Sequence, residues 1–143
     1  MIKTIKSSNL FWNDVQIYEN NDKQNHSVFL NEHFNISNIG VDYYNPNNIP
    51  IEFKESFNPI YKNVRFSIPE YQTKESKYFV LCLNISEYFI LRTRDILNRF
   101  TFDSKYHLTH IRLSTIRIMK IAKFDDILEL KTYINNLNDY RGK

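Results

Sequence analysis

Apolar residues recur in a strand-like pattern through the middle of the chain. Between residues 40 and 96 they alternate with polar residues or form short continuous runs, and they are rich in aromatic and β-branched types. Such runs are typical of β-strands. The pattern predicts strands at residues 40–44, 49–56, 77–85 and 87–96, with a weaker candidate at residues 63–68.

Helical spacing of apolar residues surrounds these strands. It occurs at residues 7–20, through Leu10, Phe11, Val15 and Tyr18, and less cleanly at residues 25–34, through Val28, Phe29 and Phe34. At residues 124–140 the stripe is Ile127, Leu130, Ile134 and Leu137, with Asp125 as the expected N-cap. The apolar residues of residues 107–124 fit both the helical spacing and the strand pattern. Helices that bracket strands indicate an α/β or α+β fold.

Composition narrows the class of protein. A length of 143 residues with 42% hydrophobic residues predicts a single domain, spanning residues 1–143, with a packed core. Cys82 is the only cysteine, which excludes an intramolecular disulfide and a cysteine-rich zinc site. No apolar run approaches the ~20 residues that span a bilayer, and the N-terminus lacks the apolar block of a signal peptide. We therefore expect an intracellular, cytoplasmic protein with no membrane partner.

Positive charge gathers late in the chain. The net charge is only +3, yet no acidic residue lies between Asp103 and Asp125. The basic residues in between that could bind nucleic-acid phosphates are Lys105, Arg112, Arg117 and Lys120. Arg112 or Arg117 could also read guanine edges. A merely solvated basic face fits the same residues equally well.

Two further arginines alternate along the strand predicted at residues 87–96. Arg92 and Arg94 would share one face of that strand and could approach a nucleic-acid backbone. Pairing of these arginines with Asp95 or Glu87 is the alternative that we favour.

One hairpin collects candidate chemistry. Pairing of residues 40–44 with residues 49–56 across the Asn-Pro-Asn-Asn turn sets Asp42 opposite Glu52. Glu52 and Lys54 share a face because side chains alternate along a strand. Two close carboxylates repel each other, and a divalent cation such as Mg²⁺, which accepts a sparse carboxylate shell, would relieve that repulsion. The alternative is a cross-strand salt bridge on a solvated sheet face.

This hairpin resembles the core of the PD-(D/E)xK nuclease superfamily, which includes many type II restriction endonucleases. Asp42 followed by the triplet Glu52-Phe53-Lys54 matches the D…ExK motif, although valine rather than proline precedes the aspartate. The strands predicted at residues 77–85 and 87–96 extend the resemblance to about residue 96, and a helix before the aspartate also fits. The resemblance implies a restriction-endonuclease-like core, in which helices flank a central mixed sheet.

The resemblance also implies roles for particular residues. Asp42 and Glu52 would be catalytic metal ligands for Mg²⁺, and Lys54 would position the nucleophilic water. Glu32 or Glu19 would supply a further acidic ligand from a preceding helix, and Gln72 resembles a polar residue found near the next strand in some members.

The function that follows is a magnesium-dependent, site-specific endonuclease that hydrolyses duplex DNA. A homodimer is expected, because two antiparallel strands must be cut with one site in each chain. A homing endonuclease, a junction resolvase and a nicking repair nuclease would carry the same core. Two alternatives of other classes are a non-catalytic DNA- or protein-binding domain with a nuclease-like fold, and a structural protein with no nucleic-acid role.

Overall fold

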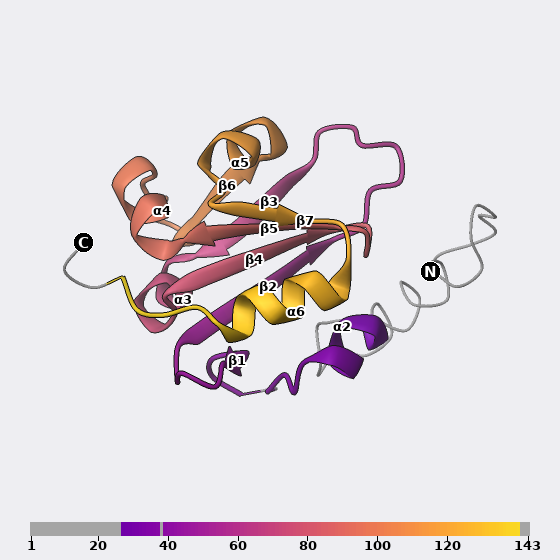
Figure 1. The fold of residues 1–143 in the computed structure, drawn as a ribbon. Coiled ribbons are helices and arrows are strands. Elements are labelled where there is room, and N and C mark those ends of the chain that lie inside the picture. Colours follow the sequence, from indigo (N-terminus) through magenta and orange to yellow (C-terminus); the bar gives the residue numbers. More distant parts are fainter. Residues whose placement is uncertain (1–26, 38, 141–143) are drawn as a thin grey trace.

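A mixed five-stranded sheet forms the centre of the computed structural model, which describes residues 27–37 and 39–140 (Figure 1). Its strands, in spatial order, are β1 (Tyr43–Tyr44), β2 (Pro50–Ser56), β4 (Tyr78–Leu83), β5 (Glu87–Arg92) and β7 (Ala122–Phe124). Strands β2 and β4 are parallel, whereas all other neighbours in this sheet are antiparallel. A parallel pair needs a long crossover connection. Residues 57–77 supply it.

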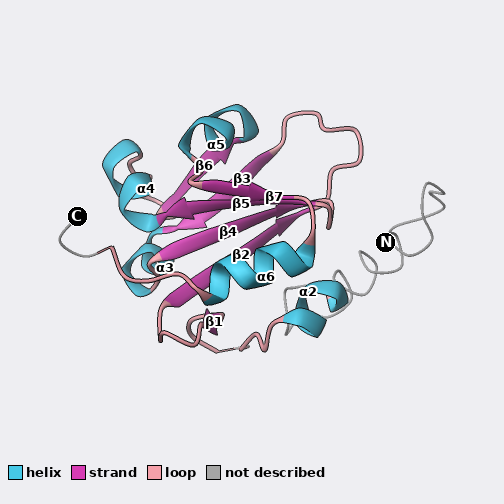
Figure 2. Cartoon of the chain, in the orientation of Figure 1, coloured by secondary structure: helices cyan, strands magenta, loops and turns pink. Residues whose placement is uncertain are grey.

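That crossover carries part of a second layer. It contains β3 (Arg65–Pro69) and α3 (Glu70–Glu75), and β3 pairs with β6 (Leu108–Arg112) as an antiparallel ribbon. Because β4 and β5 are antiparallel, α3 before β4 and α4 (Thr93–Arg99) after β5 lie at the same end of the sheet (Figure 1). The remaining helices of the described residues are α2 (Val28–His33), α5 (Leu113–Met119) and α6 (Ile127–Asn135) (Figure 2).

Two hydrophobic cores lie on opposite faces of the sheet. Every residue of β4 is buried, as expected for a central strand that is covered on both sides. Tyr78, Val80 and Cys82 join a core with α2 and α6, whereas Phe79 and Leu81 join a core with the β3–β6 ribbon and α5. The α6 core and the ribbon core are therefore separated by the sheet.

The structure confirms the predicted mixed sheet with flanking helices, and most of the predicted elements. The helix expected at residues 25–34 is α2, and the strands expected at residues 77–85 and 87–96 are β4 and β5. The weaker candidate at residues 63–68 is β3, although it belongs to the ribbon rather than to the central sheet. The helix expected at residues 7–20 and its Glu19 lie outside the described residues.

Three local predictions need correction or completion. Residues 107–124 form strand, helix and strand in turn, namely β6, α5 and β7, which is why neither template fitted the whole segment. Helix α6 is capped by Asp126, whose side chain accepts a hydrogen bond from the backbone N–H of Leu128, whereas Asp125 pairs with Lys123. Strand β5 ends at Arg92, so Arg94 lies on α4 and does not share a strand face with Arg92. Within the described ranges, no helix is both long enough and apolar enough to cross a bilayer.

Candidate active site

The β1–β2 hairpin has the register predicted from the sequence. Tyr43 pairs with Ile51 and Tyr44 with Pro50, so Asp42 precedes β1 at the position opposite Glu52. The turn is closed by Asn45, whose side-chain oxygen accepts hydrogen bonds from the backbone N–H groups of Asn47 and Ile49, each at 2.9 Å. An asparagine in this role replaces backbone pairing within a tight turn.

The same asparagine attaches the hairpin to the α6 core. The Asn45 amide nitrogen donates to the backbone carbonyl oxygens of Ile134 at 2.9 Å and Leu137 at 3.0 Å, at the end of α6. Tyr43 adds a hydrogen bond of 2.7 Å from its hydroxyl to Asn135 Oδ1. These three hydrogen bonds join residues about ninety positions apart in the chain, so they hold the hairpin in place relative to α6.

Asp42, Glu52 and Lys54 lie on the side of the sheet that faces the ribbon core. In the parallel pairing with β4, Glu52 is opposite Phe79 and Lys54 opposite Leu81, and both of those side chains belong to that core. Glu52 is only 3% exposed and Asp42 8%. This burial contradicts the alternative of a salt bridge on a solvated sheet face.

Burial and neighbouring charge perturb the titration of this cluster. Desolvation, and next the negative charge of Asp42, raise the pKa of Glu52 to about 7 from 4.5. Lys54 and the hydrogen bond from Ser76 oppose that rise. Burial lowers the pKa of Lys54, although the charges of Glu52 and Asp42 counteract it. Asp42 Oδ2 accepts a hydrogen bond of 2.9 Å from the backbone N–H of Phe53.

The C-terminal end of helix α3 contacts Glu52. Ser76, the residue that caps the C-terminus of α3, is 4% exposed and donates a hydrogen bond of 3.2 Å from Oγ to Glu52 Oε1. Sequence reasoning did not identify Ser76, because no motif marks it and the contact joins residues 24 positions apart. Its hydroxyl holds Glu52 Oε1, and a backbone hydrogen bond from Asp42 also contacts the Glu52 carboxylate.

Gln72 lies one turn before Ser76 on α3 and is buried. Its amide nitrogen is 3.4 Å from the hydroxyl of Tyr71, and its Oε1 has no hydrogen-bond partner among the described residues. Buried polar atoms are normally satisfied. Gln72 Oε1 is therefore a buried acceptor that no described residue satisfies.

Glu32, predicted as a third acidic ligand, does not lie beside Asp42 and Glu52. Glu32 is exposed on α2, and α2 packs through Leu30 and Phe34 into the α6 core, on the opposite face of the sheet from Glu52. Across residues 27–37 and 39–140, no group of three histidine, cysteine, aspartate or glutamate side chains is placed to hold a metal ion. Among the described residues, Asp42 and Glu52 are therefore a pair of carboxylates without a third metal-ligating side chain beside them.

The predicted phosphate-binding residues are exposed but lie on separate elements. Lys105 is in the loop before β6, Arg112 ends β6 opposite Arg65, Arg117 is on α5, and Lys120 caps the C-terminus of α5. Helix α5 contacts β5 and β6, whereas β1 is at the other edge of the sheet (Figure 1). Lys105, just before β6, is thus near the end of the ribbon that adjoins α3, whereas Arg112 is at the opposite end, next to α5.

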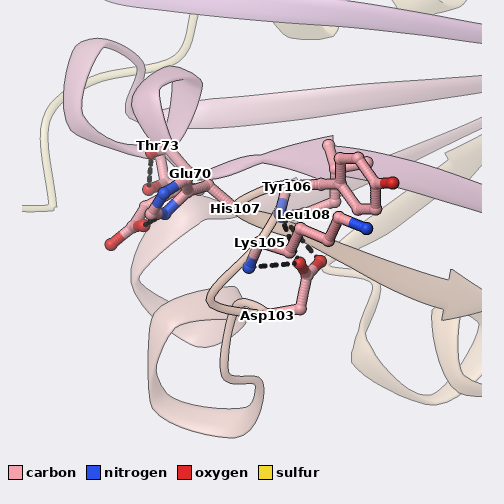
Figure 3. Close-up of polar contacts among 7 residues, drawn as sticks. All are labelled: Glu70, Thr73, Asp103, Lys105, Tyr106, His107 and Leu108. Carbon is pink, nitrogen blue, oxygen red and sulfur yellow. Dashed lines mark hydrogen bonds and ion pairs between the residues drawn. The ribbon is translucent and has the colours of Figure 1, made fainter.

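The loop that carries Lys105 is held against the start of α3, as Figure 3 shows. Asp103 organises the loop, since its carboxylate accepts hydrogen bonds from the backbone N–H groups of Lys105 and Leu108 at 3.0 and 3.2 Å. The carbonyl oxygen of His107 then accepts a hydrogen bond of 2.9 Å from the backbone N–H of Glu70. A six-residue helix is ~9 Å long. About that distance along α3 separates this loop from Ser76 and the carboxylates.

The two predicted strand arginines differ in their contacts. Arg92 Nε is 3.6 Å from Asp95 Oδ2, which confirms the pairing that we favoured. Arg94 stacks over the ring of Tyr140, with 4.8 Å between Cζ and the ring centroid. Arg94 lies at the same end of the sheet as Ser76, because α4 begins where β4 begins.

Comparisons of the chain with known protein families, with curated proteins and with solved structures find no match.

Proposed function

We propose that the protein is a magnesium-dependent endonuclease of duplex DNA, similar in mechanism to compact type II restriction enzymes. The observation that carries the proposal is the cluster of Asp42, Glu52 and Lys54, in which both carboxylates are buried and Lys54 is half-buried. Desolvation, and next the negative charge of Asp42, raise the pKa of Glu52 to about 7. Strongly shifted pKa values of adjacent acidic and basic groups are typical of catalytic sites. A surface ion pair would show neither the burial nor the shift.

The donor set fits Mg²⁺. Mg²⁺ binds proteins through one or two carboxylates and keeps waters and substrate phosphate as its other ligands. Asp42 and Glu52 provide two carboxylates from adjacent positions of a rigid hairpin. A cation between them would also offset the repulsion that raises the pKa of Glu52, so the pair is better suited to a bound cation than to an empty site.

The residues then have distinct tasks. A bound Mg²⁺ would polarise the phosphate and stabilise the leaving oxygen. Glu52 and Asp42 would hold the ion, and Ser76 would keep the Glu52 carboxylate in one orientation. Lys54, whose pKa is lowered by burial, would orient the attacking water and accept or share its proton. Water adds to phosphorus, the P–O bond to the leaving sugar breaks, and the released oxygen takes a proton from solvent.

Binding of the polyanion would use the basic residues of the ribbon and its loop. Lys105 and Arg112 are exposed on that layer, and Arg65 lies directly opposite Arg112. These residues would contact phosphates and set the orientation of the duplex. A twofold homodimer would bring one site to each strand of a palindromic target.

The test is cleavage of duplex, single-stranded and branched DNA by the purified protein, with Mg²⁺ or with EDTA. Glu52→Gln and Lys54→Met should abolish cleavage, and the matched control Glu129→Gln, on the exposed side of α6, should cut like the wild type. Because Glu52 must ionise to bind a cation, Mg²⁺-dependent activity should rise as the pH passes through about 7.

The products distinguish the related nucleases. Discrete fragments from duplex DNA support a site-specific enzyme, and cleavage restricted to branched or nicked substrates would identify a resolvase or repair nuclease. DNA binding that weakens with salt, with no cleavage in any metal, would refute catalysis and leave a DNA-binding domain with a nuclease-like hairpin.

A further inference from the structure

A cavity adjoins the candidate active site at the end of the sheet. Its volume is about 310 Å³, and its walls come from the end of α3, the start of β4, the first turns of α4 and the C-terminal segment. Ser76 belongs to both places, because it lines the cavity and its hydroxyl donates to Glu52. A ligand in the cavity would thus lie next to the carboxylate pair.

Among the charged residues that line the cavity, cations outnumber carboxylates. Lys74, Lys77 and Arg94 line it, against one lining carboxylate, Glu75. Lys77 also reaches Asp139, with 3.6 Å between Nζ and Oδ1, and its side chain remains 39% exposed. The net excess of positive charge favours an anionic ligand over a cation or a neutral molecule.

The central cation is held in place by an aromatic ring. The Arg94 guanidinium stacks over Tyr140, and the backbone N–H of Arg94 donates to the Tyr140 hydroxyl at 3.1 Å. Lys77 Nζ is 5.6 Å from the centroid of the same ring. Stacking holds the guanidinium in a defined plane, and a planar guanidinium suits the two-point recognition of a phosphate.

The shape and polarity of the cavity also fit a nucleotide unit. A volume of 310 Å³ equals that of about ten water molecules in the liquid, enough for a phosphate with part of its sugar. Asn98, one turn after Arg94 on α4, adds an exposed amide, and Leu97 adds an apolar surface. Polar donors beside a small apolar wall are typical of sites that hold a sugar-phosphate.

We propose that this cavity binds a backbone phosphodiester of the nucleic acid, adjacent to the phosphodiester at Asp42 and Glu52. This inference rests on the proposed function, because the position of the second phosphate is defined by cleavage at Asp42 and Glu52. Arg94 makes the main contact, Lys74 and Lys77 contribute charge, and Ser76 links the two sites. The cavity phosphate would set which strand, and which position along it, enters the carboxylate site.

The experiment measures binding of a fluorescent DNA duplex in Ca²⁺ without Mg²⁺, at several salt concentrations. Arg94→Gln should bind about 10-fold more weakly, and the slope of log affinity against log salt should fall by about 1. Arg99→Gln, a control at the other end of α4, should match the wild type. Equal affinity and slope for wild type and Arg94→Gln would overturn the proposal.

A second variant guards against an effect of Arg94 on folding. Asn98→Asp places a negative charge at an exposed position of the cavity and leaves Arg94 and Tyr140 unchanged, and it should also weaken binding by repelling the phosphate. Full binding by Asn98→Asp would overturn the proposal even if Arg94→Gln fails to bind.

Neutral methylphosphonate linkages, introduced one at a time, then locate the phosphate. One linkage should weaken the wild type and leave Arg94→Gln unaffected, and the absence of any such linkage would refute the assignment. The outcomes separate the two proposals. DNA binding that depends on Arg94, without any cleavage, would support phosphate binding in the cavity and refute nuclease activity. Cleavage that is unchanged by Arg94→Gln and Asn98→Asp would support nuclease activity and refute phosphate binding in the cavity.

Discussion

The Glu52→Gln substitution is expected to stabilise the protein above neutral pH and to have little effect below pH 4.5. In the folded protein the pKa of Glu52 is about 7, against 4.5 for an unperturbed glutamate. Between these values the unfolded chain is ionised at this position while the folded chain keeps its proton. The wild type therefore loses stability as pH rises through this window.

The magnitude follows from the size of the pKa shift. At about 1.36 kcal/mol for each pKa unit, the shift of Glu52 corresponds to about 3 kcal/mol of unfolding free energy. Glutamine keeps the shape of the side chain and can still accept the hydrogen bond from Ser76, but it has no charge to desolvate. Above pH 7 the variant should exceed the wild type by about this amount, relative to their difference at pH 4.

Urea unfolding at half-unit steps from pH 4 to pH 8 measures the effect as a difference between the two proteins, which cancels contributions from groups that do not interact with Glu52. Asp42→Asn should lower the folded-state pKa of Glu52 and so narrow the pH range over which stability is lost. It removes the negative charge that is the second-largest cause of the raised pKa, and it leaves desolvation in place. Glu129→Gln, at an exposed position, should give a flat difference. A constant difference between Glu52→Gln and wild type from pH 4 to pH 8 would refute the electrostatic account of the site.

Two further predictions concern the scaffold that holds the site. Asn45→Ala should destabilise the protein by about 2–4 kcal/mol in urea unfolding, because four backbone groups of the turn and of the α6 end lose their partner. Asn47→Ala, at an exposed position of the same turn, should cost less than about 1 kcal/mol, and equal losses would refute the role of Asn45. Asp126→Ala should cost about 1 kcal/mol by removing the N-cap of α6, whereas Asp125→Ala should change the unfolding free energy by less than half as much. A larger loss of unfolding free energy for Asp125→Ala than for Asp126→Ala would identify Asp125 as the N-cap.

The candidate site was predictable as far as it depends on local periodicity. Alternation along a strand places Glu52 and Lys54 on one side whatever the rest of the chain does, and the turn residues set the pairing with the strand after Asp42. The central strand was equally clear, because a continuous apolar run such as that of β4 must be covered on both faces. These features are encoded within about ten residues each.

Other features were decided by contacts between distant segments. The sequence of residues 107–124 is compatible with both helix and strand, and pairing of β6 with β3 and of β7 with β5 selects the outcome. Arg94 alternates with Arg92 in the sequence, yet the strand stops where the sheet ends and α4 begins. Local propensity differs too little between the two states to decide such segments against tertiary packing.

The sequence by itself therefore determined which residues carry the candidate chemistry and that three of them share a face. Only the tertiary structure decided that this face is covered, by α3 and the ribbon, so that Glu52 is buried beneath Ser76 and its pKa rises. The physical reason is that periodicity is a property of one element, whereas desolvation depends on every segment that packs over it.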